Sequence, residues 1–248
     1  MLRELTLRDN IRSAVKRNVT SLVDLINNIV THIRANLPEG KELLVIIDDL
    51  EKIPDVKKAD DLFIQAGSYM TTPKCKIIFT VPIALYYSLK FQQLSDTFGK
   101  TYPLPNIKVY AKGNPENIDP SGCMHEFFKK RINERLFEKS AIDTAIFNSG
   151  GVAREFVRIL KNSCTKALAQ SRDTVTKDIV DAVIINLRNE FSRGLEKRHM
   201  DVLKAYLNNL DTDDDRTKME LFHAKVLLEY LNGSKWVEIN PIVKPLIR

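Results

Sequence analysis

The chain of 248 residues is poor in cysteine and lacks any long apolar run. Its three cysteines, Cys75, Cys123 and Cys164, form no C-x-x-C pair, and an odd number argues against a disulfide scaffold. Reduced thiols in the cytoplasm are the simplest explanation. No apolar run approaches the length of a membrane span, and the charged start, MLRELTLRDN, is not a signal peptide. We therefore expect a cytoplasmic protein with no membrane partner.

The sequence also lacks the patterns of common hydrolytic sites. Its four histidines have no metal-ligand spacing, and no serine or cysteine lies in a nucleophile elbow. A metal-dependent or nucleophilic hydrolase is therefore disfavoured. The net charge of +6 permits contact with nucleic acid or an acidic surface, although a mild excess of lysine is often only solvated surface.

The first part of the chain alternates helical and strand patterns. Apolar residues recur at helical spacing over 13–36, and further helices are expected over 55–70 and 83–98. Apolar runs predict strands over 43–47, 76–80 and 106–111. Strands that alternate with helices predict a parallel α/β sheet.

After residue 112 the strand signal disappears until the C-terminal region. Helical patterns cover 123–137, 141–148, 152–169 and 177–191, followed by 195–210 and 219–224. Two β-rich runs, 226–231 and 235–239, then flank Asn232-Gly233-Ser234, which is a strong hairpin signal. We therefore predict three domains: an α/β part over 1–112, a helical module over 113–193 and a winged-helix-like module over 194–248.

The most informative segment is ELLVIIDDLEK, residues 42–52. Its apolar strand delivers two carboxylates, Asp48 and Asp49, to the strand's carboxyl end. In P-loop ATPases the first such acid holds the Mg²⁺ that bridges the β and γ phosphates, and the second orients or deprotonates water. The alternative is an ordinary strand-to-loop turn, where aspartate is common. No G-x-x-x-x-G-K-[ST] phosphate loop, or Walker A motif, precedes this strand.

Two further residues fit the same chemistry. Thr80 follows the strand over 76–79, where a polar side chain can sense the γ phosphate; the alternative is an N-cap for the helix that begins near Pro82. Arg154 follows the Ser149-Gly150-Gly151 break and lies in the first turn of a helix, where a cation is unfavourable unless it reaches an anion. The alternative for Arg154 is an ordinary surface arginine.

These elements, in this order, resemble the AAA+ superfamily of P-loop ATPases, in particular its origin-recognition-type and STAND members. The resemblance covers about residues 13–239. It implies that Asp48 is the Walker B acid that binds Mg²⁺ and that Asp49 occupies the position of the catalytic acid. Thr80 would be sensor 1 and Arg154 sensor 2 on a helical lid, both in contact with ATP. The fold implied is a partial parallel-sheet core without its Walker A strand, then the lid and a winged-helix-like module.

The sequence departs from the family in several ways. Walker A is absent, Asp49 replaces the usual glutamate, and no arginine occurs between Arg34 and Arg131 to serve as an arginine finger. In this family the Walker A strand lies between the strand that ends at Thr80 and the one that ends near Ala111. Without that strand, these two must close on each other or something else must fill the gap.

We therefore interpret the chain as the distal portion of a AAA+/STAND-type nucleotide switch that hydrolyses no ATP by itself. The complete protein would use ATP and Mg²⁺. The alternative is a winged-helix DNA-binding protein on a degenerate ATPase scaffold. The hairpin carries one lysine, Lys235, and an acidic stretch over 211–215 lies nearby, so a protein partner is favoured over DNA. Oligomerisation is compatible with either interpretation.

Overall fold

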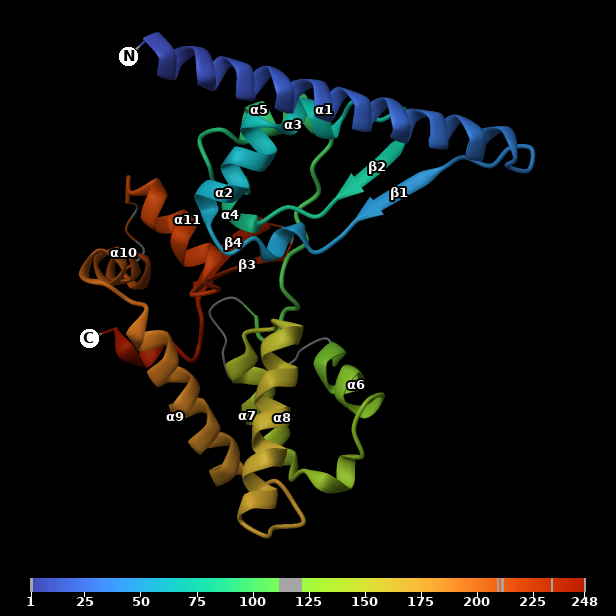
Figure 1. Ribbon diagram of the computed structural model, residues 1–248. Coiled ribbons are helices and arrows are strands. Elements are labelled where there is room, and N and C mark those ends of the chain that lie inside the picture. Colours follow the sequence, from blue (N-terminus) through green and yellow to red (C-terminus); the bar gives the residue numbers. More distant parts are fainter. Residues whose placement is uncertain (1, 112–121, 209, 211, 233, 248) are drawn as a thin grey trace. The chain divides into compact units, whose positions relative to one another are not determined.

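The structure, a computed structural model, describes residues 2–111, 122–208, 210, 212–232 and 234–247, with the side chains of α1 described from Asn18 onward (Figure 1). The chain divides into two compact units, residues 1–102 and 103–248. The structure therefore joins the predicted helical module and the C-terminal module in one unit, and it assigns residues 103–112 to that unit and not to the first.

Unit 1 contains a long helix, a two-stranded sheet and several short helices. In chain order they are α1 (Leu2–Ala35), β1 (Leu44–Ile47), η1 (Leu50–Lys52), α2 (Val56–Asp60), η2 (Asp61–Gln65), α3 (Gly67–Met70), β2 (Lys76–Phe79), α4 (Ile83–Tyr86) and α5 (Phe91–Phe98). The predicted helix over 55–70 is interrupted by the π-helical η2, and the one over 83–98 by residues 87–90. Among the described residues, no helix has the length and apolar character needed to cross a membrane.

The sheet of unit 1 is parallel, as predicted. Val45 pairs with Ile77 and Ile47 with Phe79. Phe79 contacts Phe98 of α5 with ring centroids 5.3 Å apart, so this face of the sheet is packed against helices. Asn27 of α1 accepts a hydrogen bond from the Lys74 amide, 2.8 Å away, which connects α1 to the start of β2.

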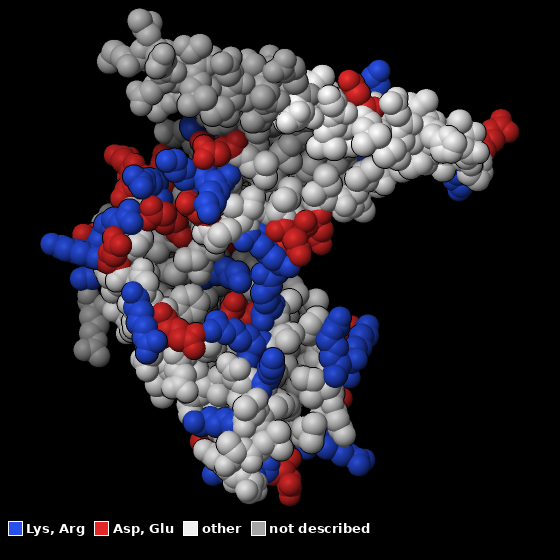
Figure 2. Space-filling model, viewed as in Figure 1, with Lys and Arg blue, Asp and Glu red and all other residues white. Residues whose placement is uncertain are grey.

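The other face of the sheet is exposed and apolar. Leu44, Ile46 and Ile78 are 50%, 64% and 51% exposed, although parallel sheets are usually covered on both faces. On α1, Leu22, Leu25, Ile29 and Ile33 are also exposed. Figure 2 shows much of this part of unit 1 without charged side chains on the face in view. Unit 1 therefore has apolar side chains on α1 and on the sheet that are not buried by its own packing.

Unit 2 consists of helices followed by a hairpin. Its elements are α6 (Cys123–Lys129), η3 (Glu134–Leu136), α7 (Lys139–Ser149), α8 (Ala153–Ala169), α9 (Lys177–Arg193), α10 (Lys197–Leu207), α11 (Asp215–His223), β3 (Leu227–Asn232), β4 (Ser234–Ile239) and η4 (Lys244–Leu246). β3 and β4 are antiparallel, with Tyr230 opposite Trp236, so the predicted hairpin is confirmed. The predicted helix over 123–137 is wrong beyond Lys129, since the chain leaves the helix there and resumes as η3.

One large hydrophobic core lies in unit 2. It joins residues of α6 to α9 with the hairpin and with Val109 and Tyr110. Tyr230 stacks on Trp236 with ring centroids 4.5 Å apart. The first part of β3 is buried on both faces, because Leu227, Leu228, Glu229 and Tyr230 are all at most 5% exposed, whereas Leu231 near its end is 57% exposed.

The predicted strand over 106–111 is wrong. This segment lies in unit 2, where Asn106 donates its amide hydrogen to the Glu229 carbonyl (3.0 Å) and Ile107 donates to the Gly151 carbonyl (3.2 Å). Its apolar side chains, Val109 and Tyr110, are buried in the core of that unit rather than in the sheet. Among the described residues the sheet of unit 1 contains β1 and β2 alone, so the gap expected next to β2 is not closed by this segment.

Candidate functional site

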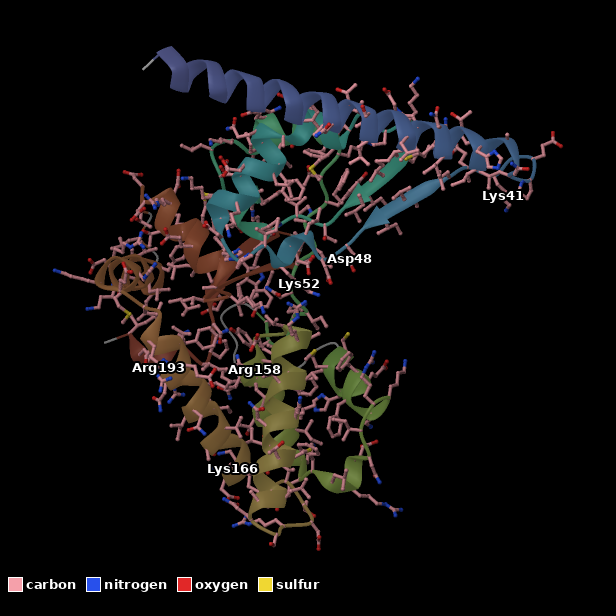
Figure 3. The ribbon with its side chains drawn as sticks, viewed as in Figure 1. Lys41, Asp48, Lys52, Arg158, Lys166 and Arg193 are labelled. Carbon is pink, nitrogen blue, oxygen red and sulfur yellow. The ribbon has the colours of Figure 1, made fainter. Side chains whose placement is uncertain are left out.

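The candidate site begins where β1 ends, in a tight acidic turn. Asp48 accepts a hydrogen bond at Oδ1 from the Asp49 amide, 2.8 Å away. Asp49 has φ +71°, a left-handed conformation that is uncommon outside glycine but tolerated by aspartate. Its carboxylate pairs with Lys52, on the turn of η1 that follows. In Figure 3, Asp48 and Lys52 lie together just beyond the end of β1.

Thr80 connects the end of β2 to this turn. Its amide donates to the Ile47 carbonyl (3.1 Å), which extends the parallel pairing by one residue. Its hydroxyl oxygen accepts a hydrogen bond from the Leu50 amide at 3.1 Å. The alternative role as an N-cap is wrong, because α4 begins after Pro82 and Thr80 bonds to the β1 side instead. Asp48, Asp49 and Thr80 therefore lie at one edge of the sheet, on neighbouring strands.

A third carboxylate joins Asp48 and Asp49 in this turn. Glu51 is half-buried, and the three side chains offer carboxylate oxygens that lie within 4.8 Å of one another. Carboxylate oxygens are the donors that Mg²⁺ prefers, and this ion usually keeps several waters and takes one or two protein carboxylates. Sequence reasoning missed Glu51. The available signal was an acid in the same short segment, three residues after Asp48; the left-handed turn at Asp49 brings the two close together.

Asp48 and Asp49 are exposed, so a ligand can reach both. The Asp48 carboxylate accepts a hydrogen bond from the Asp49 amide at Oδ1, and a carboxylate has further lone pairs that can bind a cation. Asp49 is already held by Lys52, and it would have to leave that lysine to act as a base. The turn can therefore bind a cation more readily than it can activate water.

Arg154 belongs to unit 2. It is exposed and lies in the first turn of α8, as predicted, after Val152 at the N-cap position. The preceding glycines both adopt left-handed conformations, with φ +56° at Gly150 and +71° at Gly151. A Cβ at Gly151 would lie 1.6 Å from the Ile107 carbonyl oxygen, so only glycine fits there. The structure brings Asp48, Asp49 and Thr80 together in unit 1, whereas Arg154 belongs to unit 2.

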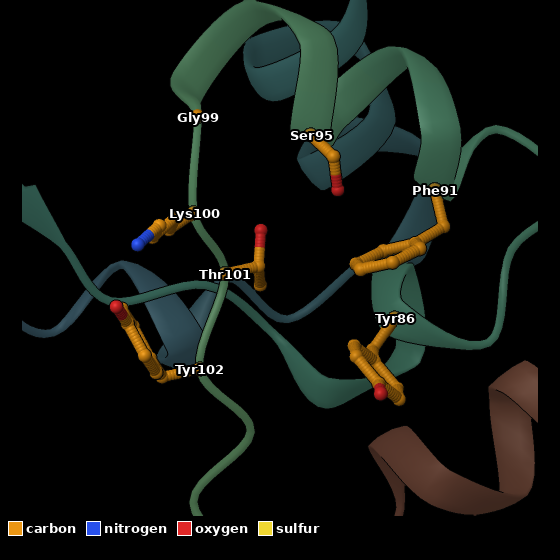
Figure 4. A pocket seen from close by; sticks show the side chains of 7 residues that line it. All are labelled: Tyr86, Phe91, Ser95, Gly99, Lys100, Thr101 and Tyr102. Atoms are coloured by element: carbon orange, nitrogen blue, oxygen red, sulfur yellow. The ribbon is translucent and has the colours of Figure 1, made fainter.

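Unit 1 has a further hollow on its surface, an open pocket of about 710 Å³. Seven residues line it: Tyr86, Phe91, Ser95, Gly99, Lys100, Thr101 and Tyr102. Figure 4 shows the rings of Tyr86 and Phe91 on one side and Lys100 and Tyr102 on the other. The lining includes one cation and no carboxylate, so it offers ring surfaces but no acid–base pair. None of the acidic-turn residues contributes to it.

No protein-family model matches the sequence, and no curated protein matches it. Among solved structures, the chain is similar to the Aeropyrum pernix ORC2 protein in its ADPNP–ADP complexes, with 16% identity, a TM-score of 0.41, and coverage of 91% of this chain and 67% of that chain. It is also similar to a variant of Thermotoga maritima RuvB, with 16% identity, a TM-score of 0.36, and coverage of 86% and 72%. Likeness of this extent assigns neither a family nor a function to the chain.

Proposed function

We propose that this chain is the distal portion of a nucleotide-dependent switch of the AAA+ or STAND type, the portion that follows the phosphate-binding loop. The observation that carries the proposal is the meeting of Asp48, Asp49 and Thr80 at the carboxyl ends of two parallel strands, through the Leu50–Thr80 hydrogen bond. The crevice beyond the carboxyl ends of parallel strands is where open α/β sheets bind their ligands.

In this proposal each residue has one task. Asp48 is the ligand of Mg²⁺, with Glu51 as a second oxygen donor behind it. The chemistry that Mg²⁺ supplies in such sites is neutralisation of charge on the phosphate oxygens. Thr80 responds to the terminal phosphate. Its hydroxyl oxygen accepts a hydrogen bond from the Leu50 amide, so a phosphate that contacts Thr80 also acts on the turn that contains Asp48. Arg154 is a second phosphate contact on the lid helix α8.

The chain by itself is proposed to be inactive as an ATPase. No Walker A sequence occurs in the 248 residues, so no backbone nest for the phosphates is supplied. Asp49 is engaged by Lys52, and the sequence between Arg34 and Arg131 offers no arginine finger.

We further propose that the partner of the C-terminal module is a protein. The hairpin's Lys235 is engaged by the buried Glu229 at 2.9 Å, so it is not directed at phosphates. Leu207, Leu210 and Leu231 are 43%, 63% and 57% exposed on this module, and apolar side chains of this kind are common in protein interfaces. The winged-helix DNA reader is the alternative, which a DNA-binding measurement decides.

The metal-binding role is tested with Mn²⁺ as a stand-in for Mg²⁺, because free Mn²⁺ can be counted by electron paramagnetic resonance. We expect saturable, weak binding, with a Kd on the order of 10⁻⁴–10⁻³ M. Asp48→Asn should weaken it at least about tenfold. Asp96→Asn is the matched control, since Asp96 is an exposed acid of the same unit and should leave Mn²⁺ binding unchanged. Equal binding by wild type and Asp48→Asn would contradict the proposal.

A further inference from the structure

The turn between α7 and α8, Gly150–Glu155, carries Arg154 and is held at both ends by residues of the C-terminal module. At its first end, the Tyr230 hydroxyl donates a hydrogen bond to the Gly150 carbonyl, 2.7 Å away. A Cβ at Gly150 would lie 2.4 Å from the Leu228 side chain, so β3 packs directly on this glycine. Tyr230 and Leu228 are 1% and 2% exposed. Burial raises the pKa of Tyr230 far above its ordinary value, which keeps its hydroxyl protonated as a donor.

The second end of the turn is held by a buried ion pair. Glu155 is 6% exposed, and its carboxylate lies 3.2 Å from Lys225 Nζ and 3.4 Å from Arg158. Lys225 stands between α11 and β3 with φ +57°, and its carbonyl accepts a hydrogen bond from the Asn240 side chain at 3.0 Å. A buried carboxylate that loses its partner is costly, so Lys225 fixes the position of Glu155 strongly.

We infer that Lys225 and Tyr230 position Arg154, which lies in the chain between the two points that they hold. Arg154 immediately precedes Glu155, so the backbone of Arg154 cannot move without disturbing the Glu155–Lys225 pair. The C-terminal module thus acts on the first turn of α8 and is the route by which a protein bound to it would move Arg154. The functional importance of that route rests on the proposed role of Arg154 as a phosphate contact. The contacts that hold the turn do not depend on that role.

The chain offers a matched pair of lysines for the test. Lys225 pairs with Glu155 and Lys235 pairs with Glu229, at 3.2 and 2.9 Å. The lysine side chains are 36% and 38% exposed, and both carboxylates are buried. Substitution of either lysine by methionine removes one comparable ion pair from the same module. Lys225→Met removes a contact to the turn that carries Arg154, whereas Lys235→Met removes an ion pair within the hairpin.

Hydrogen exchange of the full chain provides the measurement. The amides of Gly151, Val152 and Phe156 donate to Ser149 or Val152 within the turn, so their exchange rates report its opening. In Lys225→Met we expect these rates to rise at least about tenfold relative to the amides of α9. Lys235→Met should leave the ratio within about twofold, since the ion pair that it removes joins the two strands of the hairpin. The Nε resonance of Arg154 should shift in the first variant and not in the second.

Lys225→Arg should keep most of the protection, because it retains a cation beside Glu155 and leaves the Glu155–Arg158 pair intact. Equal effects of the two methionine variants, or acceleration in α9 as large as in the turn, would overturn the inference. These measurements need neither metal nor nucleotide. The inference can therefore fail while Mn²⁺ binding at Asp48 succeeds, and the reverse is equally possible.

Discussion

Gly151 is the residue at which one methyl group should matter most. Its φ of +71° is strained for any residue with a Cβ, and that Cβ would lie 1.6 Å from the backbone oxygen of Ile107. Backbone cannot move aside as a flexible side chain can, so the segment over 106–111 would have to leave the turn. We expect Gly151→Ala to lower the free energy of unfolding of unit 2 by about 3 kcal/mol or more.

Trp236, the only tryptophan in the chain, lies in the core of unit 2, so its fluorescence during urea unfolding reports on this unit. Gly122→Ala is the control, because Gly122 has a similar φ of +68° but open space around it. It should cost only the left-handed strain, about 1–2 kcal/mol. Equal losses in the two variants would mean that the Ile107 contact contributes nothing.

Asp214 gives a pH-dependent prediction for unit 2. It is the N-cap of α11, and its carboxylate accepts a hydrogen bond from the Thr217 amide at 3.0 Å. Hydrogen bonds from Thr217 hold the pKa of Asp214 below its ordinary value of 3.8. A carboxyl group with a lowered pKa in the folded state stabilises at pH values above the unfolded pKa, and this contribution is lost as pH falls through the folded pKa.

Asp214→Ala should therefore lower the free energy of unfolding by about 1 kcal/mol at neutral pH. The difference from wild type should shrink as the pH falls below 3.8, where the carboxyl group takes up its proton. Urea unfolding followed by Trp236 fluorescence at several pH values checks this. Asp201→Ala, which removes an exposed acid from α10, controls for the loss of one charge. A difference that grows as the pH falls would contradict the assignment.

At the scale of helices and strands, periodicity predicted most of the fold. The strands over 43–47 and 76–80, the helices α8 and α9 and the C-terminal hairpin lie within a few residues of their predicted ranges. Each has a local signal, either an apolar run that ends in polar residues or helical spacing with clear boundaries. The parallel pairing of β1 with β2 followed from the intervening helices.

The predictions from sequence are wrong where contacts between distant parts of the chain determine the local structure. The run over 106–111 is apolar because Val109 and Tyr110 are buried in unit 2, and a short apolar run cannot by itself be distinguished from a strand. In the site, the adjacency of Asp48 and Thr80 followed from strand order, whereas the Leu50–Thr80 hydrogen bond and the Lys52 contact depend on the conformation of the turn. No sequence pattern encodes that conformation.

A charged side chain introduced on the exposed face of the β1–β2 sheet should leave the free energy of unfolding almost unchanged. Ile46 is 64% exposed on this face, so Ile46→Lys should change the free energy of unfolding by no more than about 0.5 kcal/mol. It should also reduce self-association, because a charge on an open apolar sheet opposes pairing with another chain. Circular dichroism during urea unfolding and light scattering against concentration test the two effects.

Val45→Lys is the control on the packed face of the same strand, where Val45 is half-buried and pairs with Ile77. It should destabilise unit 1 by at least about 2 kcal/mol, since it moves a charge into an apolar contact. Unchanged light scattering in Ile46→Lys would show that this face does not drive self-association.

At the scale of the whole molecule, a nucleotide site has two parts that can be considered separately: the carboxylates that bind the metal ion and the loop that binds the phosphates. In the proposed switch this chain supplies the carboxylates, and no Walker A sequence occurs in its 248 residues. Backbone amides of that loop normally contribute much of the phosphate affinity. We therefore expect isothermal calorimetry with ATP and Mg²⁺ to detect no binding in the micromolar range. Micromolar binding would reveal a phosphate cradle elsewhere in the chain.

The last prediction decides between a protein and a DNA partner for the C-terminal module. A DNA reader needs several basic side chains that are free for phosphates, and its affinity falls steeply with salt because counterions are released. Here the hairpin offers Lys235, which pairs with the buried Glu229, and residues 227–230 of β3 are buried on both faces. Fluorescence anisotropy with duplex DNA at moderate salt should therefore show little binding. Tight, salt-dependent binding that Lys235→Ala abolishes would instead establish DNA as the partner, because the proposed protein-binding role assigns this lysine no contact with a ligand.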